Sequence, residues 1–145
     1  MGTKTEQYLE MLSEEGFRPT VDEEGDITFK YEGIRLYIVV SEKDPQYFKI
    51  ADYLVWAAES EAERIKAERV ARQLNIGYKV VKVLQQDNRF GITIEMFVPT
   101  LDVIQPVLIR ILDMLKYVRN EFINLMNKPE EVDAVIEETL DESIH

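Results

Sequence analysis

The side chains of this chain that could perform chemistry are almost all carboxylates. It contains no cysteine, and its one histidine is the last residue, His145. Without cysteine there are no thiol nucleophiles, disulfides or thiolate metal sites. A lone terminal imidazole is usually solvated, which disfavours histidine-based acid–base or metal chemistry. No serine has a base near it in the sequence, so we predict no catalytic residue and no cofactor.

The densest carboxylate cluster is residues 22–26, which hold Asp22, Glu23, Glu24 and Asp26. These residues could bind a hard cation, but Gly25 comes too early for the EF-hand pattern. We interpret the cluster as a solvated turn and predict no metal site. The alternative is a carboxylate- or metal-dependent enzyme, or a regulator that binds a small ligand. The enzyme would need a pocket that gathers Asp52, Glu95 and another carboxylate.

Aromatic residues give the stronger indication of a binding function. Tyrosine, phenylalanine and tryptophan are frequent between residues 31 and 56, and they exceed what one core face of a small sheet needs. Exposed aromatic side chains often mark interfaces. We therefore predict a protein-binding surface at Tyr47, Tyr53, Trp56 and Phe97. The expected partner is a protein or peptide segment that lies along a strand edge or on the sheet surface.

The composition limits the other partners. The 145 residues include 17 basic and 28 acidic residues and carry a net charge of −11. An acidic surface repels phosphate backbones and anionic lipids, so neither nucleic acid nor a membrane surface is an expected partner. No apolar run approaches the roughly 18 residues that span a bilayer, and the first residues lack the apolar region of a signal peptide. We expect a cytoplasmic protein.

Two strands and a long helix form the clearest pattern. Hydrophobic residues alternate over 78–84 and again over 92–98, around a polar loop at 85–89. An apolar stripe of helical period follows as far as Met126. Thr100 or Asp102 is expected to cap this last helix, with Pro106 in its first turn.

The first half of the chain predicts a helix, four strands and a second helix. The first helix covers residues 5–15, and strands are expected at 17–21, 27–31, 34–40 and 47–56. Ser60 and Glu63 form a capping box for the second helix, which ends at Gly77. Asn75 in its last turn is expected to cap the helix C-terminus. The order α-β-β-β-β-α-β-β-α with short connections predicts an α+β fold, an antiparallel meander with helices packed on it.

The domain is expected to cover residues 1–127. The remaining residues, 128–145, form an acidic tail with seven carboxylates and one lysine, and their spacing allows a short helix. A second hypothesis for function is regulatory: Glu130 to Glu142 would dock on the domain, or on a basic partner, and mask a surface.

Several short motifs resemble those of the YbjN-like domains, described as bacterial sensory transduction regulators. The motifs are Tyr8-Leu9, Gly16-Phe17, Gly25-Asp26-Ile27-Thr28-Phe29, Gly33-Ile34, Tyr37-Ile38-Val39-Val40, Ala71-Arg72-Gln73-Leu74-Asn75, Lys79-Val80-Val81-Lys82-Val83 and Thr93-Ile94-Glu95-Met96-Phe97. The resemblance covers about residues 5–127. It implies a fold like that of type III secretion chaperones, a homodimer, and a non-enzymatic role in binding protein or peptide. The family has no agreed catalytic residues, so none is transferred.

Overall fold

The computed structural model describes residues 3–129, which fold into one sheet and three α-helices. The elements in chain order are α1 (Lys4–Glu14), β1 (Thr20–Val21), β2 (Ile27–Tyr31), β3 (Ile34–Ile38), β4 (Tyr47–Ala57), α2 (Glu61–Gly77), β5 (Val81–Gln86), β6 (Arg89–Phe97), the 3-10 turns η1 (Leu101–Val103) and η2 (Gln105–Val107), and α3 (Leu108–Met126). The expected order of helices and strands is confirmed. None of the helices in this part of the chain is both long and apolar enough to cross a membrane. The acidic residues after Pro129, and the short helix predicted there, lie outside the described residues.

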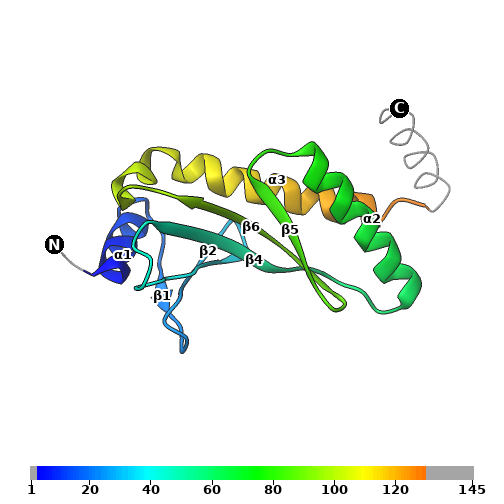
Figure 1. Cartoon of the computed structure of the whole chain (residues 1–145), viewed down its shortest axis with the longest axis horizontal. Coiled ribbons are helices and arrows are strands. Elements are labelled where there is room, and N and C mark those ends of the chain that lie inside the picture. Colours follow the sequence, from blue (N-terminus) through cyan, green and yellow to red (C-terminus); the bar gives the residue numbers. More distant parts are fainter. Residues whose placement is uncertain (1–2, 130–145) are drawn as a thin grey trace.

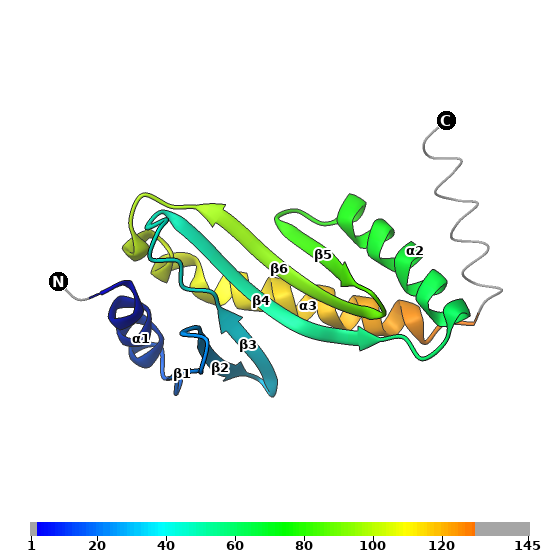
Figure 2. The ribbon, with the colours of Figure 1, turned by 60° about the horizontal axis from the view of Figure 1, so that its bottom comes forward.

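The sheet is antiparallel throughout, with the strand order β1-β2-β3-β4-β6-β5. The long strands β4 and β6 form its centre, and α3 runs behind them in Figure 2, so that the other face of these strands is turned to the viewer. Helix α1 lies at the β1–β2 end, and α2 lies beside β5 (Figure 1). The predicted α+β fold class, an antiparallel meander with helices packed on it, is confirmed.

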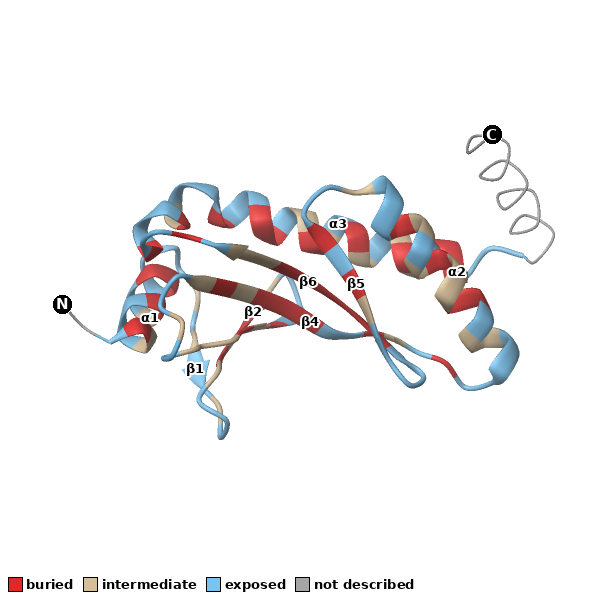
Figure 3. Cartoon of the chain, in the orientation of Figure 1, coloured by how far each residue is buried: buried red, intermediate tan, exposed pale blue. Residues whose placement is uncertain are grey.

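The core lies between the sheet and α3. Period-two alternation in the strands turns one set of side chains toward the helix, and these are fully buried residues such as Phe48, Ile50, Ile92 and Ile94. Helix α3 contributes its apolar stripe, with Leu112, Leu115, Val118 and Phe122 all buried, as the buried segments in Figure 3 indicate. The layer order is therefore helix, apolar core, sheet, and then a sheet face that none of the described helices covers.

Strand β4 carries a bulge at its centre. Its pairing with β6 passes from Asp52↔Ile92 to Trp56↔Phe90, so four steps along β4 match two along β6. Gly91 makes this possible, because a Cβ atom there would lie 2.7 Å from the carbonyl oxygen of Asp52 and 3.0 Å from that of Tyr53. The glycine therefore lets the bulged backbone of β4 approach β6.

The β5–β6 hairpin differs from the sequence prediction at both ends. Strand β5 begins at Val81 and not at Tyr78, because Val80 has a positive φ of 61° and the Val81 N–H donates to the Lys79 carbonyl at 2.7 Å. That three-residue turn interrupts the extended backbone before Val81, so the strand can begin only there. The predicted five-residue loop is also wrong. The connection is Asp87-Asn88 alone, with Asp87 at φ 57°, as tight hairpin turns require.

The two helix starts were predicted with mixed success. Ser60 does cap α2, since its hydroxyl accepts from the Glu63 N–H at 3.1 Å. The Glu63 carboxylate, however, accepts from the Trp56 indole N–H at 2.7 Å and so ties α2 to β4. The expected cap of α3 is wrong. Two 3-10 turns follow Thr100, and α3 begins at Leu108 without a side-chain cap.

Asn75 binds the sheet, contrary to the predicted C-terminal cap. Its side-chain oxygen accepts from the Val83 N–H at 2.7 Å, and its nitrogen donates to the Val83 carbonyl at 3.3 Å. The amide thus occupies the outer edge of β5 as a neighbouring strand would. At the opposite edge of the sheet β1 has only two residues. Both edges therefore offer little backbone to an added strand.

Candidate functional site: the uncovered sheet face

The uncovered side of the sheet is formed by the residues of each strand that alternate with the residues facing α3. We call it the open face, and its central residues are Tyr37, Tyr47, Lys49, Ala51, Tyr53, Lys82, Thr93, Glu95 and Phe97. Cross-strand register places them in a grid, because Tyr47 lies opposite Phe97, Lys49 opposite Glu95 and Ala51 opposite Thr93. Three of the four predicted binding residues, Tyr47, Tyr53 and Phe97, lie on this face.

Aromatic pairs occupy two positions of the open face. The rings of Tyr47 and Phe97 have centroids 6.3 Å apart, and those of Tyr37 and Tyr53 are 5.3 Å apart. The Lys49 ammonium lies 5.9 Å from the Tyr53 ring centroid. Phe97 is 77% exposed and Tyr53 is 44% exposed, although both belong to the two inner strands of the sheet. A large part of these two aromatic rings is thus held in a defined place on the sheet and left uncovered by the described residues.

Glu95 organises the polar part of the face. Its carboxylate accepts from the Tyr47 hydroxyl at 2.6 Å and the Thr93 hydroxyl at 3.1 Å, and it pairs with Lys82 at 3.5 Å. The hydrogen bond from Tyr47 is the main cause that lowers the pKa of Glu95. Burial, followed by this hydrogen bond, raises the pKa of Tyr47 to about 12. Tyr47 is therefore neutral and Glu95 ionised at neutral pH.

Trp56 is separated from the other three predicted residues. It is partly buried on the helix-covered side, where its ring centroid lies 6.5 Å from that of Phe122 in α3. Its indole N–H is used by Glu63, as described above. Tyr47 and Trp56 are an odd number of positions apart, which places their side chains on opposite faces of a strand. The bulge adds an even number of residues to β4 and so preserves these opposite faces. Tyr37, which alternation also places on the open face, is the residue missing from the predicted surface.

The acidic turn at residues 22–26 borders the open face. A shallow pocket there is lined by Asp22, Glu23, Glu24, Asp26, Tyr37 and Tyr53. The Asp22 carboxylate accepts from the backbone N–H groups of Glu24 and Asp26, as expected for a turn. Burial, followed by the charge of these carboxylates, raises the pKa of Tyr53. The face is thus acidic at its β1–β2 end and carries lysines toward β5.

The carboxylate pocket that an enzyme would need is not formed by Asp52 and Glu95. Asp52 is buried on the helix-covered side, where it pairs with Arg119 of α3, whereas Glu95 lies on the open face. The backbone of the sheet separates them. Among residues 3–129 no group of three or more histidine, aspartate and glutamate side chains is placed to hold a metal ion.

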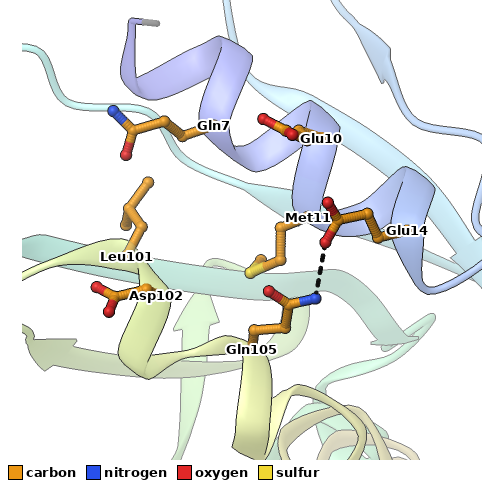
Figure 4. A pocket seen from close by; sticks show the side chains of 7 residues that line it. All are labelled: Gln7, Glu10, Met11, Glu14, Leu101, Asp102 and Gln105. Atoms are coloured by element: carbon orange, nitrogen blue, oxygen red, sulfur yellow. Dashed lines mark hydrogen bonds between the residues drawn. The ribbon is translucent and has the colours of Figure 1, made fainter. Parts of the chain in front are cut away.

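A second cleft lies between α1 and the turns before α3 (Figure 4). Met11 and Leu101 line it together with the polar side chains Gln7, Glu10, Glu14, Asp102 and Gln105. Gln105 donates to Glu14 at 3.0 Å across it. This bond joins α1 to the turns before α3, and Met11 and Leu101 both belong to the buried core. We therefore interpret this cleft as the boundary between two packed elements.

Comparison with known proteins supports the fold and gives no family. No protein-family model and no curated protein matches the sequence. Among solved structures, a chain of the crystal structure of the ExsC–ExsE complex is similar, with a TM-score of 0.52 and 12% identity over 82% of this chain and 96% of that chain. An uncharacterized protein from Methanothermobacter thermautotrophicus gives a TM-score of 0.45 and 17% identity over 84% of this chain and 93% of its own. The first likeness shows a shared fold, whereas the resemblance to YbjN-like domains stays a prediction.

Proposed function

We propose that this chain is a non-enzymatic, chaperone-like or regulatory domain that binds a protein segment on its open face. The observation that carries the proposal is the exposure of Phe97 and Tyr53 on the two inner strands β6 and β4, on the sheet face that none of the described helices covers. Full burial of a phenylalanine side chain is worth about 1.5–3 kcal/mol, so a partner that covers these rings gains substantial free energy.

The geometry favours the face over the edges of the sheet. Asn75 already occupies the outer backbone groups of Val83, and β1 is too short to template a strand. A partner segment would therefore lie across the strands, with apolar side chains beside Phe97 and Tyr53 and polar groups toward Lys49 and Glu95. The shared fold supports this proposal, because the similar chain was crystallised in the ExsC–ExsE complex.

Site-specific photocrosslinking tests the proposal. We would place benzoylphenylalanine at position 97 and, as a matched control, at Tyr117, which is an exposed aromatic residue on α3. The expected result is one protein crosslinked from position 97 in native cells, whose synthetic segment then binds the purified chain. Phe97→Ala should weaken that binding at least tenfold, and Tyr117→Ala should leave it unchanged. Equal crosslinking from both positions, or equal affinity of both variants, would refute the proposed surface.

We further propose that the protein acts as a homodimer, as the resemblance to YbjN-like domains implies, and that it is cytoplasmic, as its composition leads us to expect. Size-exclusion chromatography with light scattering should give twice the 17.0 kDa mass of the chain. A mass of one chain at micromolar concentration would contradict this part of the proposal and leave the binding surface to the crosslinking test.

A further inference from the structure

Part of the open face is basic, although the chain as a whole has a net charge of −11. The open face carries three cationic residues, which are Lys49 on β4, Lys82 on β5 and Arg89 on β6. Glu95 is the one carboxylate among the residues of these three strands that lie on the open face. Arg89 lies opposite Ala57, at the end of the sheet where β4 leads into α2. The three cations therefore form a track that runs from this end of the sheet to its middle.

A segment of opposite charge is present in the same chain. Residues 130–142 contain seven carboxylates and no basic residue, with Val132, Val135, Ile136 and Leu140 between them. This composition suits a surface that combines lysines with exposed aromatic rings. The acidic turn at residues 22–26 would repel the segment, and it therefore confines the segment to the β4–β6–β5 part of the face.

The chain leaves the domain near the end of the sheet at which the basic track begins. The carbonyl of Lys128 accepts from the Lys66 ammonium of α2 at 2.5 Å, so α3 ends beside the helix that follows Ala57. From there, thirteen extended residues span roughly 40 Å. The eight steps from Ala57 to Lys49 along β4 cover about 26 Å, and the thickness of the sheet layer adds about 10 Å. Residues 130–142 can therefore pass round the sheet and reach Lys49.

We propose that residues 130–142 bind the basic track of the open face and mask it from the partner segment. The inference rests on the proposed function, for which it supplies the regulation. A partner must then displace the acidic segment. The apparent affinity for the partner therefore equals the affinity of the free face multiplied by the fraction of molecules in which the face is free. Salt weakens the attraction of such exposed charges, so masking decreases as ionic strength rises.

Paramagnetic relaxation in the full-length chain tests the proposal directly. Because the sequence contains no cysteine, Ser143→Cys accepts one nitroxide label at a unique site. We expect the amide signals of Lys49 and Thr93 to broaden. The broadening should be lost in Lys49→Glu/Lys82→Glu and kept in Arg110→Glu, whose exposed side chain lies on α3. Unbroadened open-face amides, or equal broadening in the double variant, would overturn the proposal.

Two further experiments test whether the masking occurs within one chain and whether it weakens partner binding. In a mixed sample, one set of chains carries the nitroxide and the other set is isotope-enriched and carries no nitroxide. Broadening in this sample reports contact between two copies of the chain. Broadening confined to the mixed sample would overturn masking within one chain. Replacement of the seven carboxylates by their amides should raise the affinity for the partner segment about fivefold, and an unchanged affinity would contradict masking. Failure of any segment to bind the open face would refute the proposed function alone, because the label still locates residues 130–142.

Discussion

Gly91→Ala is the sharpest test of how the sheet positions the open face. The new Cβ atom would lie 2.7 Å from the Asp52 carbonyl oxygen, 3.0 Å from the Tyr53 carbonyl oxygen and 3.1 Å from the Tyr53 carbonyl carbon. These are backbone atoms, so no side chain can rotate to make room. Either β4 loses its bulge or it moves away from β6, and both change the position of Tyr53.

The cost follows from this geometry. Overpacking of a closely packed site typically costs about 1–3 kcal/mol, and we expect Gly91→Ala to destabilise the protein by that amount. Gly77→Ala provides a matched control, because nothing lies within 4 Å of its added Cβ and the residue ends a helix. The control should be neutral or stabilising by up to about 1 kcal/mol, since alanine restricts the unfolded chain and favours helix.

Urea denaturation measures both variants. Trp56 is the single tryptophan and lies against α3, so its fluorescence reports the separation of helix and sheet. Thermal unfolding should agree, at roughly 2–4 °C for each kcal/mol in a chain of this size. A Gly91→Ala protein as stable as the wild type, with an unchanged dependence on urea, would refute the assignment of the bulge to this glycine. We also expect its affinity for the partner segment to fall.

Two other predictions concern residues that shape the site. Asn75→Ala frees the outer N–H and carbonyl of Val83, so we expect about 1–2 kcal/mol lower stability and new self-association by light scattering, with Arg72→Ala on the same helix as the unaffected control. In Tyr47→Phe, Glu95 loses the hydrogen bond that lowers its pKa. That bond stabilises the fold above the unfolded carboxyl pKa of about 4.3 and is lost as pH falls through the lower folded pKa. The variant should therefore be about 1 kcal/mol less stable at pH 7 and converge with the wild type in acid, and an equal deficit at pH 3 would contradict the role given to Glu95.

The elements that the sequence predicted well are those specified by local burial. Ile92 and Ile94 alternate with Thr93 because one side of β6 meets α3, and this pattern is visible in a single strand. The expected strands at 27–31 and 34–40 left only Glu32 and Gly33 for the connection, and these residues form a tight turn with positive φ angles of 50° and 86°. Local chemistry determines such features, so they could be predicted without knowledge of the tertiary structure.

The features that were missed depend on contacts between distant segments. Asn75 bonds to Val83 only because α2 packs beside β5, and Glu63 accepts from Trp56 only because β4 passes the start of α2. Local capping rules cannot foresee a sheet group that competes for the same side chain. The late start of α3 has a similar origin, because Leu101 and Ile104 are buried against the core and hold the chain in two 3-10 turns.

The composition of the open face bears on how tightly a partner could bind. A purely aliphatic face would aggregate, whereas here Tyr47 is hydrogen-bonded to Glu95 and Lys49 lies over Tyr53, so much of the aromatic surface has a polar neighbour while the face is free. Phe97 has no such hydrogen-bonding group and is the most exposed of the large hydrophobic residues described. Binding should therefore depend on this one ring for most of its affinity, with the tyrosines and lysines setting orientation. A surface built in this way suits a partner that is held and then released, which is the behaviour that masking by residues 130–142 would require.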